Sequence, residues 1–180
     1  MARGRPASIT VGLKLPFFEL SGTWAPDEAE RRAAWEMYVE LVTRIGMVPL
    51  PSGEGLLREA LTSLHSLFAT TRDILRRYGP DVARPTQDSD LSFGSIAITV
   101  LNQALRPLLT VWHPALADHE SRRPPARSPA EHEREWEDAP ALREELERMR
   151  PLLIGYANML SEAADVPPLV SAAPADRGSG

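Results

Sequence analysis

The 180-residue sequence contains no cysteine, which excludes disulfide bonds, zinc sites with thiolate ligands and a cysteine nucleophile. It also lacks an apolar run of the roughly 20 residues that a membrane-spanning helix requires, so we expect no membrane span. The basic N-terminal residues are not followed by the apolar core of a signal peptide, because Thr10, Gly12, Lys14 and Pro16 interrupt it. We therefore expect a cytoplasmic protein.

Lysine is nearly absent as well, and Lys14 is its only occurrence among the 20 basic residues. Acidic residues outnumber basic ones, which gives a net charge of −5. General binding to nucleic acids requires a positively charged surface that displaces counterions, so we expect none here. A chain of this length with 43% hydrophobic and 25% charged residues is typical of one globular domain.

What the sequence does contain is four segments whose apolar residues recur every three or four positions, the spacing of amphipathic helices. We predict these helices at residues 26–45, 54–78, 93–116 and 141–164. In the second and fourth segments the steps of four and three alternate without interruption, which predicts the buried seam of a helical bundle. The predicted core positions are Leu57, Leu61, Leu64, Phe68, Thr71, Leu75 and Tyr78, and Leu142, Leu146, Met149, Leu153, Tyr156, Leu160 and Ala163.

The N-terminal region has a different pattern. Residues 9–15 alternate apolar and polar side chains, which predicts a short strand. The chain offers no evident partner strand, and only Leu169 and Val170 look even weakly suitable. Two arrangements therefore stay open: the strand pairs with a partner protein or a second copy, or the arm covers one end of the helices with its aromatic side chains.

Two further segments lack helical spacing. Residues 120–140 are rich in proline and charge, which predicts a long exposed connection with one helical turn around Trp136. The C-terminal residues have the composition of a disordered tail. We predict an all-α fold, an antiparallel four-helix bundle at residues 26–165, with an N-terminal extended arm at 1–25 and a disordered C-terminal tail at 166–180.

The third predicted helix, expected to end or bend near Pro114, carries the strongest candidate binding site. At about 100° per residue, Asn102, Arg106 and His113 fall within roughly 40° of one another, opposite a wide apolar face. The neighbouring Trp112 can bury its ring and fix the end of this helix. The four residues form either a site for a partner or ligand, or a solvent-exposed helix face with a structural anchor.

Histidines suggest an alternative, metal-dependent chemistry. His65, His113 and His119, with Asp118 or Glu120 as a carboxylate, have the ligand types that zinc or iron prefers. No HExxH pair, paired Glu-x-x-His motif or nucleotide-binding loop accompanies them. The sequence therefore favours no enzyme class, and we expect no cofactor.

Two stretches, GLLREALTSLHSLF at residues 55–68 and LNQALRPLLTVWHPAL at residues 101–116, resemble uncharacterised helical accessory proteins of actinobacterial type from multi-gene defence or conflict loci. The resemblance spans about residues 26–120 and brings no catalytic motif with it. It implies an accessory, partner-binding role. The function we expect is that of a non-catalytic interaction or assembly module in a bacterial multi-protein system, which binds a protein partner or a second copy. The alternative is a small-molecule or metal-dependent helical-bundle enzyme.

Overall fold

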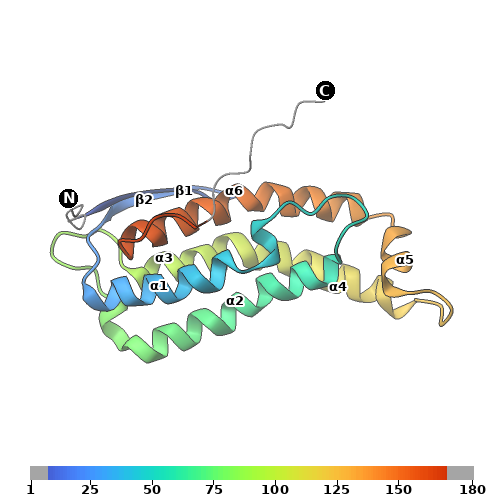
Figure 1. Cartoon of the computed structure of the whole chain (residues 1–180), viewed down its shortest axis with the longest axis horizontal. Coiled ribbons are helices and arrows are strands. Elements are labelled where there is room, and N and C mark those ends of the chain that lie inside the picture. Colours follow the sequence, from blue (N-terminus) through green and yellow to red (C-terminus); the bar gives the residue numbers. More distant parts are fainter. Residues whose placement is uncertain (1–7, 170–180) are drawn as a thin grey trace, which may run out of the picture.

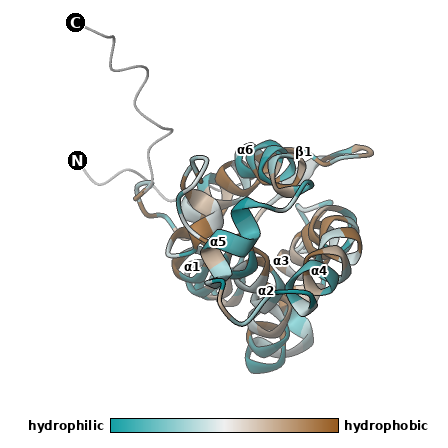
Figure 2. Ribbon diagram, turned by 90° about the vertical axis from the view of Figure 1, so that its right-hand side faces the viewer, coloured by the Kyte–Doolittle hydropathy of each residue, from teal (hydrophilic) through white to brown (hydrophobic). Residues whose placement is uncertain are grey.

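The computed structural model describes residues 8–169 and has a mainly helical fold with a small antiparallel sheet (Figure 1). The helices are α1 (Glu28–Val42), α2 (Leu57–Tyr78), α3 (Phe93–Val100), α4 (Arg106–Ser121), α5 (Pro129–Arg134) and α6 (Ala139–Ala163). The long helices run lengthwise around a common interior, and short α5 lies across one end (Figures 1 and 2). No helix in residues 8–169 has both the length and the apolar character to cross a membrane.

The start of α1 is determined by a capping box. The Asp27 side chain accepts a hydrogen bond from the Glu30 backbone N–H at 2.8 Å, and Glu30 accepts one from the Asp27 N–H at 3.1 Å. Fully buried Glu30 also accepts hydrogen bonds from the Phe93 N–H at 2.8 Å and from the Trp24 indole at 3.1 Å. One carboxylate thus satisfies the first turns of both α1 and α3.

The third predicted helix differs from a regular one in two ways. Leu101–Leu105 form a π turn between α3 and α4, in which the Arg106 N–H reaches back five residues to the Leu101 carbonyl. Of the predicted end or bend near His113 and Pro114, the end is wrong, because α4 continues through Pro114 to Ser121. Pro114 lies on the exposed side of α4, where the carbonyl that loses its N–H donor can face solvent.

The predicted strand does have a partner within the chain. Strand β1 (Ile9–Lys14) pairs with β2 (Glu19–Trp24) in an antiparallel hairpin that packs on α6 (Figure 1). Neither of the two arrangements left open by the sequence describes residues 9–24, because β1 finds its partner strand within the chain and the arm forms a regular hairpin. Sequence reasoning missed β2 because ELSGTW contains a glycine and lacks regular alternation. Exposed Leu169 lies outside the sheet, and Val170 lies outside the described residues.

Burial confirms the predicted core of the last helix in full and that of α2 in part. All seven predicted positions of α6 are buried, but in α2 Phe68, Leu75 and Tyr78 are only partly buried, and Leu67 and Ile74 are buried instead. The mainly helical class is confirmed. The antiparallel four-helix bundle stays a prediction, because a π turn interrupts one long helix and a hairpin completes one side of the core.

The connection before α6 is more ordered than its composition predicts. Its helical turn is α5, which ends before Trp136, and the side chains of His132, Glu133 and Trp136 are buried rather than exposed. The charged residues and prolines around these three side chains dominate the sequence pattern, so composition alone does not reveal their burial. Of the predicted disordered tail, Val166 packs against the core, and residues 170–180 lie outside the described residues.

Candidate functional site

Two of the predicted binding residues, Arg106 and His113, lie in a surface pocket between α2 and α4 with a volume of about 560 Å³. We call it the α2–α4 pocket. It is lined by His65, Phe68 and Arg72 from α2, and by Arg106, Leu109, Thr110 and His113 from α4. The lining therefore combines two guanidinium groups and two imidazoles with the apolar side chains of Phe68 and Leu109, which we call the apolar floor, and it includes no carboxylate from residues 8–169.

Two contacts hold the Arg106 side chain in place. Its Nε donates a hydrogen bond to Asn102 Oδ1 at 3.0 Å, one helical turn earlier. Its guanidinium carbon lies 5.0 Å from the centre of the Phe68 ring, the geometry of a cation–π contact. Asn102 therefore positions Arg106 and does not itself line the pocket.

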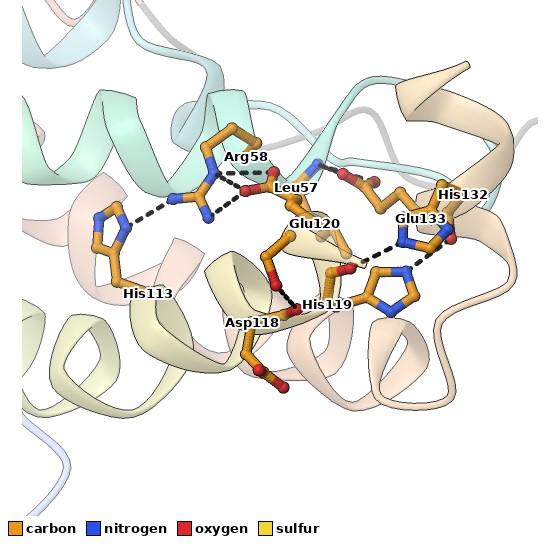
Figure 3. Close-up of polar contacts among 9 residues, drawn as sticks. Leu57, Arg58, His113, Asp118, His119, Glu120, His132 and Glu133 are labelled. Atoms are coloured by element: carbon orange, nitrogen blue, oxygen red, sulfur yellow. Dashed lines mark hydrogen bonds and ion pairs between the residues drawn. The ribbon is translucent and has the colours of Figure 1, made fainter. Parts of the chain in front are cut away.

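His113 closes one end of the pocket. Its Nδ1 accepts a hydrogen bond from Arg58 Nη1 at 2.9 Å (Figure 3), so the ring proton of the neutral form is on Nε2. The ring of His65 meets it edge to face, with 5.4 Å between ring centres. Burial, followed by the positive charge of Arg58, lowers the pKa of His113 below its ordinary value. His113 is consequently neutral at pH 7.

Arg58 connects this pocket to the far end of α4. Its Nε and Nη2 donate to the Glu120 carboxylate at 2.8 to 3.1 Å (Figure 3). This forked pair gives the Arg58 cation a counterion within the chain. The positive charge available to a ligand in the α2–α4 pocket is therefore that of Arg72 and Arg106.

Beyond Glu120, two histidines join α5 to α4. His119 Nε2 donates to the His132 carbonyl and His132 Nε2 donates to the His119 carbonyl, both at 2.8 Å (Figure 3). The two rings stack with 3.9 Å between their centres, and Trp136 stacks on His119 at 5.5 Å. Trp112, a predicted binding residue, packs edge to face against Trp136 at 6.1 Å and does not line the pocket. We call the two histidines the His119–His132 clasp.

Sequence reasoning missed the role of Glu133. Its two oxygens each lie 2.9 Å from the backbone nitrogen of Leu57, the first residue of α2 (Figure 3). Arg143 Nη2 lies 3.6 Å from Glu133 Oε1. The residue before α2 is Leu56, which has no side chain that can cap a helix. The sequence signal for this role is the lack of a capping side chain at position 56, which leaves the Leu57 N–H to be capped by a residue from elsewhere in the chain.

The structure separates the predicted metal ligands. His65 and His113 are in contact, but His119 belongs to the His119–His132 clasp. Within residues 8–169, no group of three histidine or acidic side chains is arranged to hold a metal ion.

Searches against protein-family models, curated proteins and solved structures found no match for this chain. The resemblance to actinobacterial accessory proteins therefore stays a prediction.

Proposed function

We propose that this protein is a non-catalytic interaction module that binds a protein partner at the α2–α4 pocket. One observation carries the proposal. Arg72 and Arg106 line the pocket, yet neither pairs with a carboxylate among the described residues, although acidic side chains outnumber basic ones in the chain. Unpaired guanidinium groups beside an apolar floor favour contact with another molecule.

Four other titratable side chains are already hydrogen-bonded to the backbone of the protein, which favours a binding role over catalysis. Buried Glu133 caps α2, and buried Glu30 caps α1 and α3. Both Nε2 atoms of the His119–His132 clasp are occupied by backbone carbonyls. Groups that serve the fold in this way are poor candidates for proton transfer to a substrate.

The scaffold we propose is the antiparallel four-helix bundle, with α1, α2, the α3–α4 helix and α6 as its members. Their contacts along the common interior support it. We further propose an accessory role in a bacterial multi-protein system, with a partner protein or a second copy of the chain as the occupant of the pocket. The acidic chain as a whole gives no support for general nucleic-acid binding.

Site-specific photocrosslinking tests the proposed function. Thr110, an exposed residue of the pocket lining, is replaced by benzoylphenylalanine, and the protein is irradiated in the cells from which the chain comes. Glu144, an exposed residue of α6, carries the same photoreactive group as a control. Arg106→Leu and, away from the pocket, Arg84→Leu are then added to the position-110 protein.

The proposal predicts one crosslinked species at position 110, either a partner or a second copy. Arg106→Leu removes this species and Arg84→Leu leaves it. A protein without any crosslink at position 110, or with the same crosslinks at positions 110 and 144, would contradict the proposed function.

A second candidate function, a small-molecule or metal-dependent enzyme, is favoured by the contact of neutral His113 with His65 inside the pocket. Metal analysis of protein purified without a histidine tag separates the two functions. Stoichiometric zinc or iron would favour the enzyme, whereas metal-free protein that still gives the crosslink would favour the interaction module.

A further inference from the structure

We infer that the α2–α4 pocket recognises a carboxylate side chain within an acidic peptide segment that also carries apolar residues. The inference rests on the proposed function and names the chemistry of the partner at that site. It is carried by the charge of the pocket, by the way Arg106 is held, and by the apolar floor.

The charge of the pocket is of one sign. Arg72 and Arg106 contribute two positive charges, and no aspartate or glutamate of the described part of the chain belongs to the lining. Elsewhere in residues 8–169 many arginines are paired, as Arg58 is with Glu120 and Arg143 with Glu133. The two pocket arginines therefore have no counterion among the described residues, and an anionic group from another molecule would supply one.

The Arg106 side chain is already arranged for such a group. Asn102 accepts the Nε–H, and the guanidinium carbon lies over the Phe68 ring. Among the described residues, this guanidinium group donates a hydrogen bond only through Nε. Its two terminal nitrogens, Nη1 and Nη2, can therefore donate to a ligand. A carboxylate can accept from these two nitrogens side by side, and holding the guanidinium beforehand reduces the entropy lost on binding.

The apolar floor distinguishes a peptide from a free anion. Phe68 and Leu109 line the pocket between the charged groups, and the volume of about 560 Å³ exceeds what a single carboxylate or phosphate fills. Burying these apolar side chains requires an apolar partner next to the acidic one. A peptide that carries acidic and leucine-like side chains next to one another meets both requirements, whereas inorganic phosphate meets one.

Nuclear magnetic resonance of the arginine side chains tests this inference on the intact chain. The Nε–H signals of Arg72 and Arg106 are followed during titration to about 10 mM, which detects even millimolar binding. The probes are the peptide acetyl-Leu-Glu-Glu-Leu-amide, its glutamine counterpart acetyl-Leu-Gln-Gln-Leu-amide, and inorganic phosphate. Arg106→Gln and, as a matched control outside the pocket, Arg84→Gln are titrated with the acidic peptide.

The inference predicts that the acidic peptide shifts both pocket signals and binds more tightly than phosphate or the glutamine peptide. Arg106→Gln weakens binding about tenfold, the effect of losing a charge-assisted pair of hydrogen bonds, and Arg84→Gln does not change it. Absent shifts, equal shifts with the glutamine peptide, or tighter binding of phosphate would each overturn the inference.

Failure of this inference is distinguishable from failure of the proposed function. A crosslink at position 110 that depends on Arg106, together with no response to the acidic peptide, leaves the interaction module standing and removes the carboxylate as its ligand. The lack of any crosslink removes the interaction module itself, whatever the peptide does.

Discussion

At the scale of single residues, the buried polar groups of this protein differ in how well they are satisfied. Glu30 accepts hydrogen bonds from the backbone N–H groups of Asp27 and Phe93, and both oxygens of Glu133 accept the Leu57 N–H. The Tyr156 hydroxyl of α6, in contrast, is buried without a hydrogen-bond partner in the described chain, and burial raises its pKa. An unsatisfied buried hydroxyl contributes a desolvation cost to the folded state.

Tyr156→Phe should therefore leave the free energy of unfolding unchanged or raise it by about 1 kcal/mol, because the substitution removes the desolvated hydroxyl and keeps the ring. Chemical denaturation of the wild type and the variant measures the difference. A loss of more than about 1 kcal/mol would show that the hydroxyl makes a stabilising hydrogen bond.

His113 predicts a dependence of stability on pH. Its pKa in the folded protein lies below the ordinary value of 6.5, so the unfolded chain takes up the proton first as the pH falls. The stability that neutral His113 contributes is present above about pH 6.5 and is lost progressively below it. Glutamine at this position can still accept the hydrogen bond from Arg58 without titrating.

Between about pH 7.5 and about pH 5.5, the free energy of unfolding should therefore fall less in His113→Gln than in the wild type. Unfolding free energies at both values test this. Equal losses in the two proteins, or a larger loss in the variant, would contradict the assigned direction of the pKa shift.

At the scale of elements, the six-residue helix α5 depends on the His119–His132 clasp and on Trp136. A helix of this length has no independent stability in water. His132→Ala removes one hydrogen bond and the ring stack from a buried site, and should cost about 2 to 3 kcal/mol. Exposed Arg134→Ala in the same helix should cost less than about 0.5 kcal/mol.

Hydrogen exchange adds a local measurement to these two stabilities. In the His132→Ala protein the amides of α5 should exchange faster, while those of the α6 core keep their protection. Unchanged protection of α5 would show that contacts other than the clasp hold this helix in place.

The hairpin gives a prediction about the N-terminal strand. Ile9, Val11 and Leu13 of β1 are buried and belong to the same core as α6. Deleting residues 1–20 exposes the surface they cover, at roughly 1.5 to 3 kcal/mol for each buried side chain, so the melting temperature should fall strongly. A truncated protein that melts as before but loses self-association would instead support strand donation to a second copy.

At the scale of the whole molecule, the regular spacing of apolar residues predicted the long helices, because this spacing is what defines an amphipathic helix. The spacing of apolar residues located the long helices, and all seven positions that it predicted for the core face of α6 are buried, because a helix needs one continuous apolar face in any fold. It failed at β2, whose glycine and serine disguise a strand that its partner stabilises. It also failed at the π turn, since adding one residue to a turn leaves no mark in the sequence pattern.

The candidate site, like the fold, could be predicted only in part from the sequence. Arg106 and His113 were found because they interrupt an apolar helix, and the structure places both in the α2–α4 pocket. Arg72, the clasp partner His132 and the capping role of Glu133 depend on contacts between distant segments. Such contacts are products of tertiary packing and cannot be read from spacing along one helix.

The central claim is that the α2–α4 pocket serves binding and not the stability of the fold. Arg106→Leu tests it most directly when the free energy of unfolding and the affinity for the crosslinked partner are measured on the same protein. We predict a stability within about 1 kcal/mol of the wild type, because Arg106 is exposed, and an affinity reduced about tenfold or more. A stability loss above about 2 kcal/mol with unchanged affinity would contradict the account and make Arg106 a structural residue.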